Sequence, residues 1–129
     1  MSTTNQDRVL AFIDLWNRRD LDGLLAAMAP DCVYHNIPWA PLVGHAAIRE
    51  GLSLFVADAA EIDWQVRHIA QGADGLVLTE RLDRFLLAGQ WLEMPVMGIF
   101  QLREGLITHW RDYFDSAQFQ AAMATLNQV

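Results

Sequence analysis

The stretch LVLTERLDRFLL, residues 76–87, combines the composition of a buried strand with four charged side chains. Its Leu, Val and Phe residues favour a β-strand in a protein core. Because side chains alternate between the two faces of a strand, Arg81 and Asp83 share one face with Thr79 and Phe85. An arginine and an aspartate therefore lie two residues apart on a face whose ends are apolar.

This stretch is the second of four consecutive strands that the sequence predicts. The run EIDWQVRHIA, residues 61–70, alternates apolar and polar side chains. The runs WLEMPVMGIFQL, residues 91–102, and LITHWRDYF, residues 106–114, follow after short turns that contain glycine. Such short, turn-separated runs are typical of antiparallel strands. Pro95 inside the third run predicts a sheet edge or a β-bulge at that point.

The segments around these strands predict helices and one further strand. Thr4 caps a first helix, with Asp7 in the capping-box position, and Asp20 begins a second helix. The remaining elements are a strand over residues 32–37, a helix over 46–57 and a helix capped by Asp115. This order predicts one domain, residues 1–129, of the α+β class. We expect a cone-shaped, curved, mixed and mostly antiparallel sheet, with three to four helices packed on one face and enclosing a deep pocket.

Composition and charge limit the classes of function that this chain can have. The chain has 129 residues, of which 53% are hydrophobic, and a net charge of −7. That charge argues against nucleic-acid and anionic-membrane partners, which reward clustered basic residues. With Cys32 as the single cysteine, no intrachain disulfide can form, and a cytoplasmic location is expected because the N-terminus shows no secretory signal. The four histidines lack zinc-ligand spacing, and no phosphate loop or dinucleotide fingerprint is present, so we expect neither metal nor cofactor.

Three strands each carry polar residues on a face bounded by apolar neighbours. If these faces line one cavity, it contains Tyr34, Asn36, Arg81, Asp83 and Asp112. The side chains that we expect to line the rest of the pocket are Ile13, Trp16, Phe55, Phe85, Met94, Val96, Phe114 and Phe119.

Two aspartates in an apolar cavity form an acid–base pair. Their charges repel and each loses hydration, so one carboxyl keeps its proton. The pair then offers a general acid and a general base, while an arginine between them holds both in place. A tyrosine and an asparagine nearby can fix a water molecule. This combination suits the hydrolysis of a small, strained, apolar electrophile.

Simpler explanations of these residues remain open at this point. An Arg–Asp pair in a strand is often a structural ion pair or part of a solvated face. Asn36 could end its strand by bonding to the backbone. Asp112 could pair with Arg111, or cap the last helix in place of Asp115.

Over nearly the whole chain, the sequence resembles the limonene-1,2-epoxide hydrolase family, within the nuclear transport factor 2-like (SnoaL-like) superfamily. The resemblance is carried by VYHNIPWAPLVG, LTERLDRF and GIFQLREGLITHWRDYFD, in that order. It implies that Tyr34 and Asn36 hold the attacking water and that Asp112 is the general base. It also implies that Asp83 is the general acid and that Arg81 bridges the two carboxyls.

The resemblance further implies a cofactor-independent, one-step addition of water to a small hydrophobic epoxide, terpene-like or cyclic, giving a vicinal diol. It implies a homodimer as well. Bulky Trp16 and Phe85 suggest a pocket that is narrower than, or shaped differently from, one suited to a cyclic monoterpene epoxide. The alternatives are a ketosteroid-isomerase- or polyketide-cyclase-like enzyme, or a non-catalytic ligand-binding dimer module of the same fold. The combination of all five residues favours hydrolysis over these.

Overall fold

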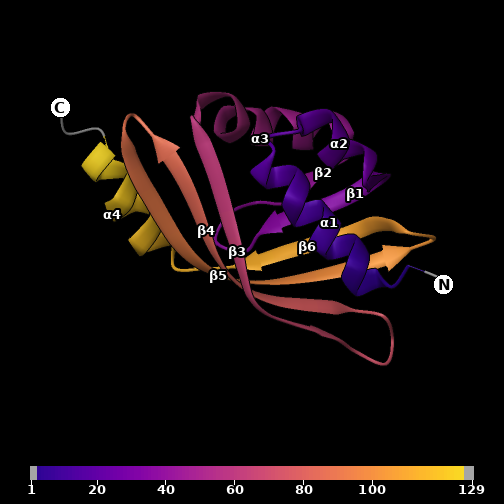
Figure 1. The fold of residues 1–129 in the computed structure, drawn as a ribbon. Coiled ribbons are helices and arrows are strands. Elements are labelled where there is room, and N and C mark those ends of the chain that lie inside the picture. The colour runs from indigo at the N-terminus through magenta and orange to yellow at the C-terminus, as the bar shows by residue number, and fades with distance from the viewer. Residues whose placement is uncertain (1–2, 127–129) are drawn as a thin grey trace.

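The structure is a computed structural model and describes residues 3–126. Within that range the chain forms four helices and six strands (Figure 1). In chain order they are α1 (Asn5–Asn17), α2 (Leu21–Ala26), β1 (Met28–Asn36), β2 (Leu42–Val43), α3 (His45–Asp58), β3 (Glu61–Gln71), β4 (Val77–Leu87), β5 (Gln90–Arg103), β6 (Leu106–Tyr113) and α4 (Ser116–Leu126).

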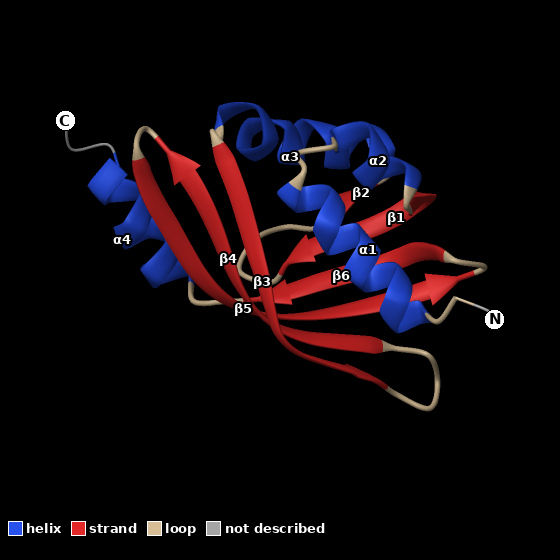
Figure 2. Ribbon diagram, in the orientation of Figure 1, coloured by secondary structure: helices blue, strands red, loops and turns tan. Residues whose placement is uncertain are grey.

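The strands form one mixed, mostly antiparallel sheet in the order β2-β1-β6-β5-β4-β3. Only β1 and β6 pair in parallel, and β3 to β6 follow one another as a meander. The sheet curves strongly, α1, α2 and α3 lie over its concave side, and α4 lies apart from them beyond β5 (Figure 2). The α+β class and the curved sheet predicted from the sequence are confirmed.

The predicted helix caps are confirmed in detail. Thr4 Oγ1 accepts a hydrogen bond from the Asp7 backbone N–H at 3.0 Å, and the Asp7 carboxylate accepts one from the Thr4 N–H at 3.3 Å. Asp20 caps α2 through the Gly23 N–H at 2.9 Å. Asp115 caps α4 by accepting from two N–H groups of its first turn. These side chains satisfy donors that a helix start otherwise leaves unpaired.

The first strand starts earlier than the sequence predicted. β1 begins at Met28, not at residue 32, because α2 ends at Ala26 and Met28 already pairs with Ile107 of β6. A register irregularity between Met28 and Val33 accommodates this early start. The segment between the predicted strand and the predicted helix over 46–57 contains β2, a two-residue strand that pairs with β1.

The strand register departs from strict alternation at β6. Strict alternation would place Leu106 on the same face as Trp110 and Asp112, but Ile107 is the buried residue. Gln101 of β5 pairs with His109 but Leu102 pairs with Ile107, so Thr108 is an extra residue in β6 that moves the burial pattern by one position.

Pro95 fits its prediction. It pairs with Leu82 of β4, whereas the pairing of β5 with β6 begins only at Met97. At Pro95 the strand is therefore locally an edge of the sheet, and the missing N–H of proline removes no hydrogen bond to β6.

Aromatic side chains form the core between α1 and the sheet. Trp16 of α1 stacks on Trp64 of β3 with ring centroids 4.2 Å apart, and Phe12 meets Trp110 of β6 edge-on at 5.1 Å. Such contacts hold α1 against the middle of the concave face. In the part of the chain that the structure describes, no helix is both long and apolar enough to cross a membrane.

Candidate active site

Strand pairing brings the predicted polar residues together on the concave face. Parallel pairing of β1 with β6 aligns Asn36 with Asp112 and Tyr34 with Trp110. On the other side of β5, the strand β4 contributes Arg81 and Asp83, two residues apart on the same face. All five predicted residues therefore lie in one region, although they come from three strands.

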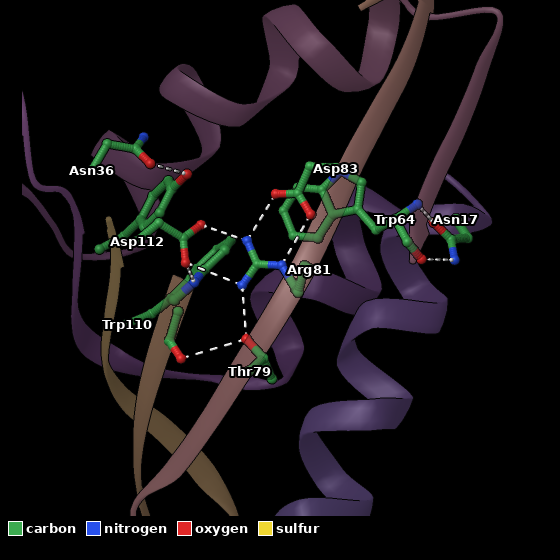
Figure 3. Close-up of polar contacts among 10 residues, drawn as sticks. Asn17, Asn36, Trp64, Thr79, Arg81, Asp83, Trp110 and Asp112 are labelled. Atoms are coloured by element: carbon green, nitrogen blue, oxygen red, sulfur yellow. Dashed lines mark hydrogen bonds and ion pairs between the residues drawn. The ribbon is translucent and has the colours of Figure 1, made fainter. Parts of the chain in front are cut away.

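Arg81 lies between the two aspartates and contacts both through paired hydrogen bonds (Figure 3). Its Nε and Nη2 donate to Asp83 Oδ1 and Oδ2 at 2.9 and 2.8 Å. Its Nη1 and Nη2 donate to Asp112 Oδ1 and Oδ2 at 3.2 and 2.8 Å. The three side chains are almost completely buried. Bidentate, charge-assisted pairs of this kind fix both carboxyls in position.

Burial and neighbouring charges shift the pKa values of Asp83 and Arg81 in this network. Burial raises the pKa of Asp83 from 3.8 to about 6, against the opposing effect of Arg81 and with a further raising effect from Asp112. Burial alone would lower the pKa of Arg81, but the negative charges of Asp112 and Asp83 outweigh it, so the net pKa is raised. Arg81 therefore stays charged, while Asp83 is able to hold a proton at weakly acidic pH.

Tyr34 and Asn36 form a second polar pair beside Asp112. The Tyr34 hydroxyl donates to Asn36 Oδ1 at 3.1 Å, and the Tyr34 ring stacks on Trp110 at 4.0 Å between centroids. Burial, followed by the charge of Asp112, raises the pKa of Tyr34, so the phenol is neutral. The hydroxyl oxygen and the Asn36 amide group remain able to bind a water molecule.

Trp110 is a site residue that the sequence analysis did not single out. Its Nε1 donates to Asp112 Oδ1 at 2.8 Å, so Asp112 accepts three N–H groups, two of them from Arg81. The available signal was the spacing, because Trp110 lies two residues before Asp112 and on the same face of the strand.

Trp64 is a second residue that was missed. The Arg81 guanidinium lies over its ring, 4.7 Å from the centroid. The Trp64 backbone is held by Asn17 at the end of α1, whose side chain accepts from the Trp64 N–H at 2.7 Å and donates to its carbonyl at 3.2 Å (Figure 3). Alternation puts Trp64 on the apolar face of β3, but it gives no sign of the contact with Arg81.

A cavity of about 90 Å³ opens onto the two carboxyls. Asp83 and Asp112 reach the cavity, whereas Arg81 lies behind them and is not part of the lining. Of the eight predicted pocket residues, seven line it: Trp16, Phe55, Phe85, Met94, Val96, Phe114 and Phe119. Ile13 does not, because α1 turns this side chain into the core. The lining also includes residues that were not predicted: Trp39, Leu42, Gly51, Leu52, Trp64 and Leu92.

Other reactive side chains lie outside this arrangement. Burial raises the pKa of the Cys32 thiol to about 12, which makes it a poor nucleophile. Among residues 3–126, no three His, Cys, Asp or Glu side chains gather in a way that could hold a metal ion. The chemistry that the cavity itself offers is proton donation by one carboxyl and proton acceptance by the other.

Comparison with known proteins supports this picture. Residues 3–125 match the family model of the limonene-1,2-epoxide hydrolase catalytic domain. The chain is 34% identical over 108 residues to the epoxide hydrolase EphG of Mycobacterium tuberculosis, across 83% of this chain and 70% of that protein. It is similar to the structure of an M. tuberculosis LEH-like epoxide hydrolase, with a TM-score of 0.79 and 30% identity over 94% and 90% of the two chains. A SnoaL-like polyketide cyclase from Shewanella denitrificans has a TM-score of 0.82 at 15% identity over 94% and 97% of the chains, a likeness of fold alone.

Proposed function

The chain belongs to the limonene-1,2-epoxide hydrolase family and is an epoxide hydrolase, and we propose that it adds one water molecule directly to a small hydrophobic epoxide, without a cofactor. The observation that carries this proposal is the double bidentate contact of Arg81 with Asp83 and Asp112 at the base of an apolar cavity. It holds an acid and a base on either side of one cation.

Asp83 is proposed as the general acid. Its raised pKa, about 6, keeps a useful fraction of the carboxyl protonated near neutral pH. Both Asp83 oxygens accept hydrogen bonds from Arg81, so the acidic proton is directed away from the guanidinium and toward the cavity. There it can be donated to the epoxide oxygen as the ring opens.

Asp112 is proposed as the general base, with Tyr34 and Asn36 orienting the water. Because the Tyr34 hydroxyl donates to Asn36 Oδ1, the Tyr34 oxygen can accept one water hydrogen and Asp112 the other. The Asn36 NH₂ group can donate to the water oxygen, whose second lone pair then faces the epoxide carbon.

The reaction is then a single displacement. The water oxygen forms a bond to an epoxide carbon while that carbon's bond to the ring oxygen breaks. One water proton moves to Asp112, and the Asp83 proton moves to the released oxygen. The product is a vicinal diol, and proton exchange with solvent restores both carboxyls. Mutual positioning of water and epoxide supplies much of the rate increase.

The cavity supports small, apolar epoxides as substrates. Apart from Tyr34, Asn36, Asp83 and Asp112, its lining is made of apolar side chains and one glycine. Its volume of about 90 Å³ is well below the several hundred Å³ of pockets that hold drug-sized ligands. Compact cyclic or terpene-like epoxides fit these properties better than polar or extended ones.

Isomerase and cyclase chemistry is less well supported. Proton transfer next to a carbonyl group needs one acid or base, and it gives no role to a second carboxyl or to a water-binding Tyr–Asn pair. The resemblance to a polyketide cyclase at 15% identity concerns the fold, which does not assign an activity.

Turnover of epoxides tests the proposal directly. We expect purified protein to convert cyclohexene oxide to diol without added metal or cofactor. In H₂¹⁸O with enzyme in excess, the first turnover should place ¹⁸O in the diol, because no enzyme oxygen enters the product. Asp112→Asn should lower kcat by roughly 10³-fold or more, as expected for loss of a general base. Failure on a broad epoxide panel, or unlabelled diol in the first turnover, would contradict the mechanism.

We also propose that the protein is a homodimer formed through the outer face of the sheet. Leu78, Met97 and Tyr113 point away from the concave face and are exposed on the neighbouring strands β4, β5 and β6. An apolar strip of this kind is suited to pairing with a second copy.

A further inference from the structure

The ion network has to cross a strand. Arg81 lies on β4 and Asp112 on β6, and β5 runs between them. Neighbouring strands are about 4.8 Å apart, so the guanidinium must pass over β5 to reach Asp112. Gly98 is the β5 residue that pairs with Asp112 on one side and with Thr79 on the other. The crossing therefore takes place where β5 has no side chain.

No backbone requirement explains a glycine at this position. Gly98 lies inside β5, is paired on both sides, and has no positive φ, unlike Gly44, Gly75, Gly89 and Gly105. A glycine inside a strand is less stable than alanine by about 0.5–1 kcal/mol. Glycine there often marks the close approach of another group.

The close approach at Gly98 is made by the network itself. A Cβ atom added to Gly98 would lie 2.6 Å from Asp112 Oδ1 and 3.1 Å from Thr79 Oγ1, and it would collide with Arg81 Nη1. All three neighbours belong to the hydrogen-bonded network, and two of them form the contact between Arg81 and Asp112. An alanine at this position would thus separate the cation from the proposed base.

Thr79 completes the same arrangement. Its hydroxyl accepts from Arg81 Nη1 at 3.2 Å and donates to the Gly98 carbonyl at 3.4 Å (Figure 3). A guanidinium has five N–H donors. Four are used by the two aspartates, and Thr79 accepts the fifth. Thr79 is 1% exposed, so no solvent molecule could easily replace it.

We infer that Thr79 and Gly98 form a positioning pair that fixes the Arg81 guanidinium against Asp112, Gly98 by leaving space and Thr79 by accepting the remaining N–H. Neither residue lines the cavity, so both act through Arg81 rather than on the substrate. The catalytic consequence rests on the proposed function, whereas the effect on the guanidinium does not.

Kinetics of four variants test the catalytic consequence. Gly98→Ala and Thr79→Val should each lower kcat about tenfold or more, with KM changed little, because the interaction lost orients groups that react rather than groups that bind. Thr79→Ser keeps the hydroxyl and should retain most of the activity. Gly89→Ala is the matched control, because Gly89 has a φ of +76° but no atom within 4 Å of an added Cβ. It should lose stability and keep kcat.

The Arg81 side chain gives a readout that does not depend on activity. With all five N–H donors bonded, rotation about its Cζ–Nη bonds should be slow, giving separate, exchange-protected Nη–H signals in ¹H–¹⁵N NMR spectra. In Gly98→Ala and Thr79→Val these signals should merge and exchange faster with water, whereas Thr79→Ser and Gly89→Ala should keep them.

The NMR result decides the inference. Separate, protected Arg81 signals in both Gly98→Ala and Thr79→Val would overturn it, whatever the kinetics. If Gly98→Ala does not fold, Thr79→Val with Thr79→Ser as its control carries the test. If the wild-type protein opened no epoxide while the variants still mobilised Arg81, the proposed function would fail and the positioning role would stand.

Discussion

Asp83 and Asp112 share one arginine but differ in their other hydrogen bonds. Asp83 accepts two N–H groups, both from Arg81, whereas Asp112 accepts two from Arg81 and a third from Trp110. Hydrogen bonds to a carboxylate favour its charged form. The extra donor therefore favours charge on Asp112 and the proton on Asp83, and a buried trio with one cation and one anion is neutral overall. This asymmetry supports the proposed division into acid and base.

Replacing Trp110 by phenylalanine tests the contribution of that third donor. Trp110→Phe retains a ring to stack on Tyr34 and removes the N–H bonded to Asp112. We expect kcat to fall by roughly 10- to 100-fold, since hydrogen bonds to charged groups are worth about 1.5–3 kcal/mol. Trp91→Phe is the control, because Trp91 lies on the outer face against Arg84. Steady-state kinetics measure the effect, and a wild-type kcat in Trp110→Phe would remove Trp110 from the mechanism.

The raised pKa of Asp83 predicts how the rate depends on pH. A general acid must be protonated, so kcat/KM should fall as the pH rises through about 6, the pKa of Asp83. A rate profile from pH 4.5 to 9 measures this dependence. An activity that rose continuously over this range would contradict the role of Asp83 as the acid.

The same shift predicts a dependence of stability on pH. The pKa of Asp83 is about 6 in the folded state, against 3.8 for the ordinary aspartate of an unfolded chain. At a pH between these two values, the folded state retains a proton that the unfolded state has lost. The contribution of this retained proton to the free energy of unfolding is fully present below about pH 4 and is lost as the pH rises through about 6. The loss is roughly 3 kcal/mol at most. Asp83→Asn cannot titrate. Its free energy of unfolding relative to wild type should therefore increase from pH 4 to pH 7, as measured by urea titration.

At the scale of elements, α1 is tied to the β3–β4 hairpin at both of its ends. Asn5 donates to the Gly75 carbonyl at 2.9 Å, and Asn17 bonds both backbone groups of Trp64. Since β3 is an edge strand of the sheet, Asn17 satisfies backbone groups that would otherwise have no strand partner. It also fixes the residue whose ring lies under the Arg81 guanidinium.

These two asparagines form a matched pair for mutation. Asn17→Ala and Asn5→Ala each remove side-chain bonds to the hairpin and should each lower stability by about 1–3 kcal/mol. Only Asn17→Ala should also lower kcat, because only Trp64 contacts the ion network. Thermal unfolding and kinetics of both variants separate the two effects. Equal kcat values in the two variants would show that Trp64 does not position Arg81.

The sequence predicted the elements with strong local signals. Period-two patterns located β3 and β4, and Thr4, Asp20 and Asp115 marked three helix starts. The early start of β1 was not predictable, because it depends on pairing with β6, a contact between distant parts of the chain. The extra residue in β6 was not predictable either, because no glycine or proline marks it in the sequence. The alternation of side chains along a strand correctly predicted that Arg81, Asp83 and Asp112 face inward. Ile13 was misassigned because a helix stripe facing the core and one facing a cavity have the same spacing.

Trp110, Thr79 and Gly98 show a second limit of the sequence. Alternation correctly places Thr79 and Trp110 beside acidic or basic residues, but hydrogen-bond partners depend on side-chain conformations. Gly98 differs from the turn glycines in having no positive φ. The reason for a glycine there is visible only in the structure, where the Arg81 side chain crosses β5. Site residues that act through space between strands are therefore found from the fold.

At the scale of the whole molecule, the sheet separates two apolar surfaces with different uses. The concave face contains the cavity, whereas the outer face exposes Leu78, Met97 and Tyr113, at 42%, 50% and 49%. Met97 and Tyr113 are also direct cross-strand neighbours, so the exposed apolar side chains are contiguous across β5 and β6. Water contact with such a strip is unfavourable, and a second copy of the chain would remove it.

A single charge in this strip tests the proposed dimer. Wild-type protein should sediment at twice the chain mass of 14.6 kDa, and Met97→Arg should sediment as a monomer because a charged side chain in the apolar strip opposes its burial against a second copy. Leu54→Arg is the control, since Leu54 is 67% exposed on α3 rather than on this face. It should remain dimeric. A monomeric wild type at tens of micromolar, or a dimeric Met97→Arg, would rule out this interface while leaving the ion network, which lies entirely within one chain, unaffected.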